Sequence, residues 1–382
     1  MYKTIEELVT RVDERNSDGT VSELIGVSID KCFIKSVANT NGTDLSKYKI
    51  IRKNDFAVSL MQVSRDGKIP VARLEEYEEA IMSPAYPIFR VKDKNIILPE
   101  YLEMWFKRPE FDREAAFIAV GGVRGSMPWE EFAKMKLPVP PIEKQRKIVN
   151  AYKIVTDRIA LKQKINDNLA NTEQLILHQA ISKNQTVPLS LNEIAEFIDG
   201  DRGKNYPTFD EFSTSGFCLF LNASNVTSSG FNFDSCMFVT EEKDKIMRNG
   251  HLLLNDIVFT SRGTLGNVAL YDKNIKYKNV RINSGMLIIR PKGINLSPYF
   301  IYALLKSNYM KSAIEQFRSG SAQPQLPIKD LQNITFDIPE SQNVLDDLEH
   351  RFFKIEETIS INKREIGNLN ELTSVLLARL SR

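Results

Sequence analysis

Histidine and cysteine are the residue types in this 382-residue chain best suited to hold a metal ion or to attack a substrate. The histidines form no HExxH-type grouping, and the cysteines lack the paired spacing of a zinc site or a disulfide framework. We therefore expect packed or solvated histidines, and reduced thiols in a cytoplasmic protein. These residues are His178, His251, His350, Cys32, Cys218 and Cys236.

Glycine-rich segments could cradle a phosphate, but those of this chain depart from the known loops. Gly200-Asp-Arg-Gly203-Lys204 lacks both the spacing and the Ser/Thr of a P-loop. The segments 121–125 and 263–266 lack the strand-loop-helix context of a dinucleotide site. There is no GxSxG elbow and no Asp/Asn-Pro-Pro-Tyr/Phe run of an amino-methyltransferase. These absences favour a binding module over an enzyme, and we expect no catalytic, cofactor or metal residues.

Polar side chains in glycine-flanked loops suggest another chemistry, the reading of base edges. Arg and Lys pair with guanine, Asn and Gln with adenine, and Ser and Thr with either. Any one of these residues can equally be a solvated loop residue or a phosphate contact. The candidate DNA-binding residues are Gln62, Arg65, Lys68, Arg73, Arg124, Ser126, Arg202, Lys204, Asn205, Asn222, Asn225, Arg262, Thr264, Asn267, Arg281, Gln323 and Gln325.

Composition limits the classes of protein that remain. The chain is 42% hydrophobic and 26% charged, which is typical of folded globular domains, and its length predicts at least two of them. The formal net charge of +2 does not by itself indicate a nucleic-acid binder, but it allows local basic patches. The charged N-terminal segment is unlike a signal peptide. No apolar run reaches 18 residues, so we expect no membrane span.

The elements that must position these loops occur twice, about 200 residues apart. Asn54-Asp55 matches Asn255-Asp256, and Arg90 at the end of an apolar run matches Arg290. Further matched pairs are a proline that opens an apolar helix (99 and 298), a Gly- or Ser-rich loop (120–126 and 318–325), and a strand that ends in proline (135–140 and 334–339). An internal repeat of this length predicts two similar domains.

Each repeat ends in a proline-free stretch, 143–182 and 341–382, with apolar residues spaced by threes and fours. Such spacing predicts a coiled-coil seam, although any amphipathic helix can produce it. A helix of about 40 residues is about 60 Å long and cannot bury its seam alone, so we expect the two helices to pair antiparallel. The seam residues are Ile148, Tyr152, Val155, Ile159, Leu169, Ile176, Leu348, Phe352, Ile355, Ile359, Ile366, Leu369, Leu376 and Leu380, with polar entries such as Lys162, Asn166, Glu173, Asn362 and Thr373.

Four parts follow: a globular domain (1–142), a long helix (143–182), a second globular domain (187–340) and a second long helix (341–382). The predicted fold class is α+β, with two pseudo-symmetric α/β domains separated by two long antiparallel coiled-coil helices. Because protein pseudo-symmetry commonly mirrors that of a duplex, two such domains on a rigid spacer would read two unlike half-sites of double-stranded DNA.

The segment Leu137-Pro-Val-Pro-Pro-Ile-Glu-Lys-Gln145-Arg-Lys-Ile148-Val resembles the strand-proline-helix signature of type I restriction specificity subunits. Its second copy, Phe336-Asp-Ile-Pro339-Glu-Ser-Gln342, is degenerate and lacks the second proline, which leaves the start of the second helix open. The resemblance implies two target-recognition domains, and helices that dock two methyltransferase subunits. S-adenosylmethionine, ATP and Mg²⁺ would belong to partner subunits, with restriction or translocase subunits as further partners left open.

Three other functions remain as alternatives. One is the specificity subunit of a methyltransferase-only or type IIB-like system, which differs only in its partner subunits. Another is a coiled-coil scaffold that binds proteins and no DNA. The last is an enzyme of unrecognised type, which S-adenosylmethionine or nucleotide binding by the isolated chain would reveal.

Overall fold

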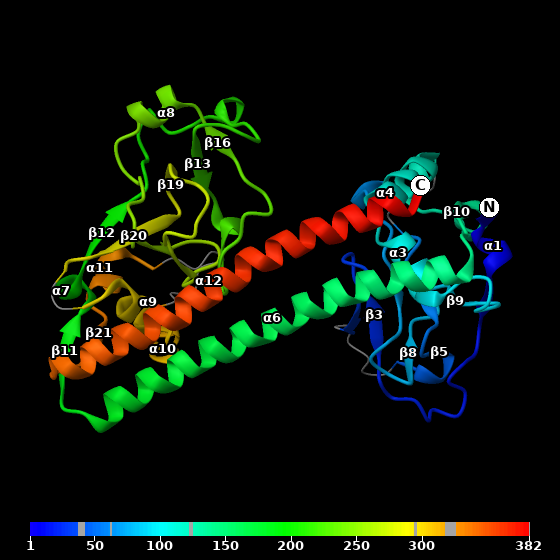
Figure 1. Ribbon diagram of the computed structural model, residues 1–382, viewed down its shortest axis with the longest axis horizontal. Coiled ribbons are helices and arrows are strands. Elements are labelled where there is room, and N and C mark those ends of the chain that lie inside the picture. Colours follow the sequence, from blue (N-terminus) through cyan, green and yellow to red (C-terminus); the bar gives the residue numbers. More distant parts are fainter. Residues whose placement is uncertain (37–42, 62, 122–124, 294–295, 318–325, 382) are drawn as a thin grey trace. The chain divides into compact units, whose positions relative to one another are not determined.

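The structure is a computed structural model that describes residues 1–36, 43–61, 63–121, 125–293, 296–317 and 326–381 (Figure 1). They form two compact units. Unit 1 comprises Met1–Ala160 with Gly367–Arg382, and unit 2 comprises Leu161–Ile366. Among the described residues, no helix is both long enough and apolar enough to cross a membrane.

Unit 1 is built on a four-stranded antiparallel sheet in the order β2-β9-β6-β7. Its strands are β2 (Val9–Val12), β9 (Ile88–Val91), β6 (Phe56–Val58) and β7 (Val71–Arg73). Pairs of shorter strands flank this sheet: β1 (Tyr2–Thr4) with β10 (Lys136–Pro138), β3 (Ile25–Val27) with β4 (Phe33–Lys35), and β5 (Lys49–Arg52) with β8 (Glu79–Met82). The helices are α1 (Ile5–Leu8), η1 (Leu45–Lys47), α2 (Val63–Asp66), α3 (Pro99–Phe106), α4 (Pro109–Ile118), η2 (Ala119–Gly121) and α5 (Trp129–Lys134).

Unit 2 repeats this plan with a sheet in the order β12-β20-β17-β18. The sheet strands are β12 (Ala195–Asp199), β20 (Met286–Pro291), β17 (Ile257–Thr260) and β18 (Val268–Leu270). The other strands are β11 (Thr186–Ser190), β13 (Cys218–Leu221), β14 (Val226–Thr227), β15 (Gly230–Phe231), β16 (Phe238–Val239), β19 (Val280–Ile282) and β21 (Thr335–Pro339). The helices are α7 (Leu191–Ile194), η4 (Phe209–Glu211), η5 (Ala223–Asn225), α8 (Glu241–Ile246), α9 (Pro298–Lys306), α10 (Asn308–Phe317) and α11 (Ile328–Gln332).

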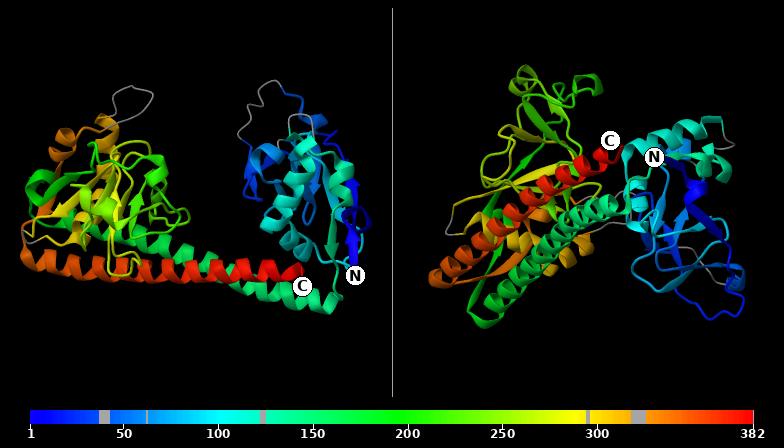
Figure 2. Two further views of the ribbon diagram at one scale, coloured as in Figure 1. Left: turned by 90° about the horizontal axis from the view of Figure 1, so that it is seen from above. Right: turned by 45° about the vertical axis from the view of Figure 1, so that its right-hand side comes forward.

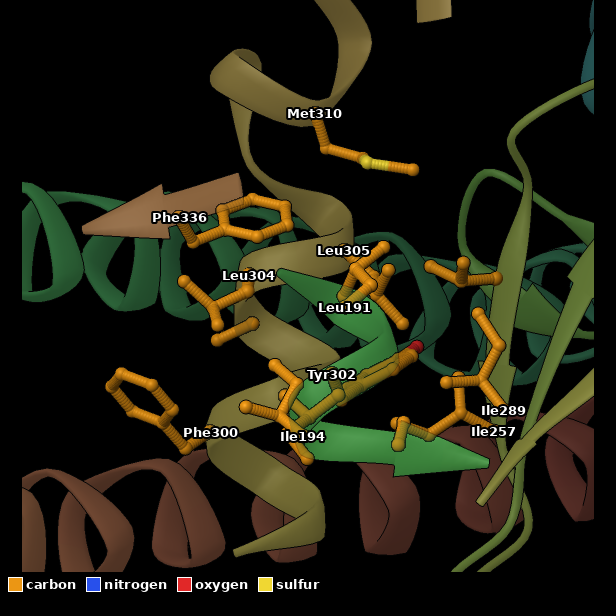
Figure 3. Close-up of a cluster of buried hydrophobic side chains, with 14 of the residues drawn as sticks. Leu191, Ile194, Ile257, Ile289, Phe300, Tyr302, Leu304, Leu305, Met310 and Phe336 are labelled. Carbon is orange, nitrogen blue, oxygen red and sulfur yellow. The ribbon is translucent and has the colours of Figure 1, made fainter. Parts of the chain in front are cut away.

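The core of unit 2 forms around α9, whose residues from Phe300 to Leu305 are all buried. Proline at its first turn fixes the backbone for helix entry without losing a hydrogen bond. Figure 3 shows Leu191 and Ile194 of the α7 turn lying beside this helix, with Ile257 and Ile289 of the sheet on the same side. Fully buried Phe352 of the second long helix completes the cluster, which attaches the domain to that helix.

Matched residues of the two repeats make the same bonds in both units. Arg90 donates to both carboxylate oxygens of Asp55 at 2.7 and 2.8 Å, and Arg290 donates to both of Asp256 at 2.8 and 2.7 Å. The preceding residues Asn54 and Asn255 have φ values of 71° and 73°, a left-handed conformation that asparagine tolerates better than most residues. The repeat therefore extends from sequence to hydrogen-bond geometry.

The first long helix, α6, spans Ile142–Lys183, and the second, α12, spans Gln342–Ala378 and ends in the turn η6 (Arg379–Ser381). The expected stretches were 143–182 and 341–382, so α12 ends a few residues early in a 3₁₀ turn. Each proposed seam residue is buried or half-buried, while most of the intervening positions are exposed. The apolar residues that recur with the 3.6-residue period of a helix are thus the residues that are buried.

Within each unit, segments of α6 and α12 pack together. In unit 2, Lys162 of α6 pairs with Glu365 of α12, whereas Glu173, further along α6, shares a lysine with Glu356, further back along α12. The pairing is therefore antiparallel (Figures 1 and 2). In unit 1, Leu377 of α12 and Leu380 of η6 join the core with Ile148 and Tyr152 of α6. The fold class is as predicted from the sequence: two similar α/β domains and two long antiparallel helices.

The hydrogen bonds of Gln145 explain why a glutamine stands at the start of α6. Its side chain is fully buried, and its Oε1 accepts a hydrogen bond of 2.9 Å from the N–H of Leu98, the residue before α3. Its Nε2 donates to the carbonyls of Ile96 and Pro140, both at 2.8 Å. In unit 2 the residue before α9 is Ser297, whose own hydroxyl accepts from the N–H of Phe300. The glutamine of the second copy, Gln342, is exposed and donates instead to Asp346 of its own helix at 2.8 Å.

Candidate nucleic-acid interface

Several candidate residues of unit 2 lie in segments that come close together and form a surface that we call rim 2. It consists of the loop 200–208 after β12, the helix η5, the β17–β18 turn (261–267) and the β19–β20 turn (283–285). Close backbone approach holds these segments together, since a Cβ at Gly200 would collide with the carbonyl of Asn283. A Cβ at Gly263 would lie 3.9 Å from Ala223 of η5. The approach at position 200 therefore requires glycine, whereas at position 263 the φ of +74° favours glycine.

Exposed cations project from rim 2. Arg202 donates to Asp199 and to the carbonyl of Ser284, so its guanidinium is held near the β19–β20 turn while half of its side chain stays exposed. Arg262 is exposed in the β17–β18 turn, with its Cβ close to Gly285. Lys204 is also exposed. These side chains can reach an anionic ligand without unfolding any element.

Asp201 gives the loop 200–208 its shape. Its carboxylate accepts hydrogen bonds from the backbone N–H groups of Gly203 and Arg248, at 2.9 Å each. These bonds lower the pKa of Asp201, because they stabilise the ionised carboxylate. The exposed side chain of Arg248, a residue that was not among the sequence-based candidates, is thereby placed beside rim 2. Only the fold brings it there, since Arg248 is 47 residues from Asp201 in the chain.

The corresponding surface of unit 1, which we call rim 1, consists of the β6–β7 turn with α2, the turn η2 and residues 125–127. Arg65 of α2 and Lys68 are exposed and have acidic neighbours, Asp66 at 2.9 Å and Asp30 at 4.0 Å. Gly125, with a φ of +73°, approaches Ser64 so closely that a Cβ would lie 2.5 Å from its hydroxyl. The half-buried Ser126 therefore lies next to α2.

Both rims are built by equivalent bonds. The N–H of Met127 donates to the carbonyl of Leu60 at the end of the central sheet region of unit 1, at 2.9 Å. The N–H of Leu326 donates to Ser261 at the same place in unit 2, at 3.4 Å. In each repeat, the chain thus returns from the Gly- or Ser-rich loop to the turn that carries the exposed cation.

Several candidates have internal partners instead. Arg73 is buried and pairs with Glu100, Glu103 and Glu75. Arg281 is buried and binds Asp244 and three backbone carbonyls beneath α8. These contacts occupy the donor groups that a base would need, so neither arginine is part of the rims.

Asparagine candidates mostly shape the loops of unit 2. Asn225 is buried and bonds to the carbonyls of Asn232 and Ser235. Half-buried Asn205, Asn222 and Asn267 bond to Ile246, Ser224 and Val226 respectively. Thr264 is exposed in the β17–β18 turn, where it can face a ligand. The candidates Gln62, Arg124, Gln323 and Gln325 lie outside the described residues.

The histidines, cysteines and carboxylates bear on metal binding and nucleophilic chemistry. Within the described part of the chain, no three His, Cys, Asp or Glu side chains lie close enough together to hold a metal ion. Cys218 is buried, and burial raises the pKa of its thiol, so it is a poor nucleophile. What the rims offer chemically is hydrogen bonding and positive charge.

Comparison with known proteins identifies the family of the chain. Residues 23–171 and 185–371 match the type I restriction modification DNA specificity domain. The specificity subunit of the type I restriction enzyme MjaIX from Methanocaldococcus jannaschii is 21% identical over 304 residues, which is 75% of this chain and 69% of that protein. The crystal structure of a type I restriction-modification S subunit from M. genitalium has the same fold, with a TM-score of 0.61, 17% identity, and 100% and 96% of the two chains covered. With two matched specificity domains spanning most of its length, the chain belongs to the family of type I restriction-modification specificity subunits.

Proposed function

We propose that this specificity subunit reads a bipartite DNA target, with rim 1 on one half-site and rim 2 on the other. One observation carries the proposal: two domains with the same bonding pattern present different side chains at equivalent rims. Arg65 and Lys68 project from rim 1, whereas Arg202 and Arg262 project from rim 2. Equivalent placement with unlike side chains suits two related but different sequences.

We further propose that the long helices dock two methyltransferase subunits, and that restriction subunits bind through them. Off the seam, α6 and α12 expose large apolar side chains where a solvated helix is normally polar. They are Ile154, Leu161, Ile165, Leu175, Ile361, Leu372 and Val375. Catalysis then belongs to the partner subunits, which bind S-adenosylmethionine, ATP and Mg²⁺, and this chain determines the DNA sequence at which they act.

Reciprocal rim variants test the recognition role. In complex with its methyltransferase subunits, Arg262→Ala should weaken binding to the cognate duplex by roughly 10- to 100-fold if it contacts a base. In this variant, base substitutions in only one of the two half-sites should no longer change the binding affinity. Arg65→Ala should act on the other half-site, so each variant is the control for the other. Equal loss of both half-sites, or no loss from either variant, would contradict the proposal.

A different pair of variants tests docking. Leu175→Glu should reduce co-purification of the methyltransferase subunits while the circular dichroism of the free chain stays unchanged. Lys164→Glu, exposed on the same helix, is the control and should retain the partners. A complex that survives Leu175→Glu, Leu161→Glu and Leu372→Glu together would place docking elsewhere. A chain that binds partners but never duplex DNA would instead favour a protein scaffold.

A further inference from the structure

Lys306, at the C-terminal end of α9, joins the recognition domain of unit 2 to both long helices. Its Nζ lies 2.8 Å from Glu173 of α6 and 2.6 Å from Glu356 of α12. Glu173 is completely buried, and Glu356 is 7% exposed. We call these three residues the anchor triad. Charged groups are rarely buried this deeply unless their charges are balanced.

The charges of the anchor triad do not balance if both carboxyl groups are ionised, because two carboxylates then face one ammonium. Glu173 adds a second cost: its Oε1 is buried and has no hydrogen-bond partner among the described residues. A proton held between the two carboxyl groups would remove the excess charge. It would also give the unpartnered oxygen a hydrogen bond.

Other ionisable groups lie near the triad. The ring of Tyr302 lies 4.6 Å from the Lys306 ammonium. Lys363 of α12 donates to the carbonyl of Ser229 and lies near Glu356; burial lowers the pKa of this lysine and Glu356 opposes that shift. Asp272 lies near Tyr302 and Lys363 and adds a further carboxyl group. On the outer side of α12, Glu357 is paired with Lys273 at 2.8 Å.

The electrostatic balance agrees with the geometry. Burial, followed by the neighbouring Glu356, raises the pKa of Glu173 to about 8. Burial opposes the charge of Lys306, but Tyr302 and the two carboxylates outweigh it and raise the pKa of the lysine. These directions favour a charged lysine and a proton on one carboxyl group of the pair.

Unit 1 lacks this arrangement at the equivalent positions. The repeat places Thr373 and Thr156 where unit 2 has Glu173 and Glu356. The lysine is retained as Lys107, which pairs with Glu103 of its own helix at 2.6 Å. Both threonine hydroxyls donate to carbonyls of their own helices. The buried carboxyl pair is therefore specific to one of two otherwise matched domain-helix junctions.

We propose that the anchor triad is a proton-dependent lock that holds the second recognition domain against α6 and α12. With one shared proton, the lock is neutral and its hydrogen bonds are complete. Loss of that proton leaves one uncompensated negative charge in the seam, which weakens the junction. The junction of unit 1 does not respond, because threonine does not titrate.

The direction of the pH effect follows from linkage. The pKa of Glu173 in the folded chain is raised above its ordinary value of 4.5, so the folded state binds the proton more tightly than the unfolded state. The stability of unit 2 should therefore fall as the pH rises from about 5 to about 8, and then level off. At most, the folding equilibrium constant should change tenfold per pH unit within that window.

The test measures urea unfolding of the full chain from pH 5 to pH 9, with hydrogen exchange to separate the two units. Glu173→Gln keeps the shape and a hydrogen-bonding group but cannot ionise, so the pH slope of unit 2 should flatten. Glu356→Gln should do the same. The double variant Glu173→Thr, Glu356→Thr copies the junction of unit 1 and should also lack the slope. Glu357→Gln, on the same turn of α12, is the control and should leave the slope unchanged.

Infrared spectroscopy supplies a second readout, since a protonated buried carboxyl group has its own carbonyl band. We expect that band at pH 6.5 in the native chain and not in Glu173→Gln. A flat pH profile of unit 2 between pH 5 and 8 in the native chain would overturn the proposal. So would a slope that persists in both glutamine variants. Neither measurement needs DNA, so a failure here is distinguishable from a failure of the proposed recognition function.

Discussion

Replacing Gln145 by leucine should loosen unit 1 where the recognition domain meets α6. The side chain makes three hydrogen bonds of 2.8 to 2.9 Å with backbone groups of Leu98, Ile96 and Pro140, and it is wholly buried. Leucine has a similar volume but no polar atoms. The substitution would therefore leave one N–H and two carbonyl groups without their side-chain partner.

The structure sets the size of this effect. At about 1 kcal/mol for each hydrogen bond, Gln145→Leu should lower the free energy of unfolding of unit 1 by about 3 kcal/mol. In a unit of this size, that corresponds to a decrease in Tm of roughly 6 to 12 °C. Ser297→Ala removes the single side-chain cap at the equivalent place in unit 2 and should cost about 1 kcal/mol there.

Urea unfolding with hydrogen exchange by mass spectrometry can assign each loss to a unit. In Gln145→Leu, peptides covering 96–106 should exchange faster, while those covering 297–306 should not change. Gln163→Leu is the matched control, because Gln163 is exposed on the same helix and its replacement should cost less than about 0.5 kcal/mol. If Gln145→Leu were no more costly than Gln163→Leu, the role given to this glutamine would be refuted.

Other expectations follow from the same contacts. Asp256→Asn should destabilise unit 2 by about 2 kcal/mol, because a carboxylate that is only 1% exposed loses its charge opposite Arg290. Hydrogen exchange of the amides in β20 measures this loss of stability. An equal loss of stability in unit 1 would contradict the prediction. Asn362→Ala should cost about 1 to 3 kcal/mol, since Asn362 links Asn166 and Lys162 across the helix pair. Urea unfolding compares it with the exposed Asn168→Ala, and equal costs would rule out a specific link.

The helices and the repeat were predictable because their signals are periodic. Apolar spacing of threes and fours follows directly from 3.6 residues per turn, so positions such as Ile148 and Phe352 could be assigned without a structure. The matched Asn-Asp and Arg segments predicted equivalent domains, and the Asp55–Arg90 and Asp256–Arg290 pairs express that match in three dimensions.

The rims were harder to predict, because exposure depends on distant elements. Arg281 lies in a strand between two apolar residues, an alternation that normally points an arginine to solvent. Helix α8 covers that side and supplies Asp244 as its partner. No local pattern announces this, and the same holds for Arg73 and its three glutamates.

The anchor triad shows how far a sequence signal can lead. A glutamate at a seam position is unusual and marks Glu173 as a residue that needs a partner. The partner, however, comes from α9, 133 residues away in sequence. Only the fold brings Lys306 to this place, and only comparison with Thr156 and Thr373 reveals that the feature belongs to one junction.

Mapping of methylated adenines tests the central claim most directly. DNA should be exposed to the complete complex carrying either the native chain or a chain with seven residues inserted into both α6 and α12. We predict a bipartite motif with two unlike halves, and a gap that lengthens by about three base pairs, since seven helical residues span about 10 Å. One continuous motif, or a gap that stays the same in an active extended complex, would contradict the account.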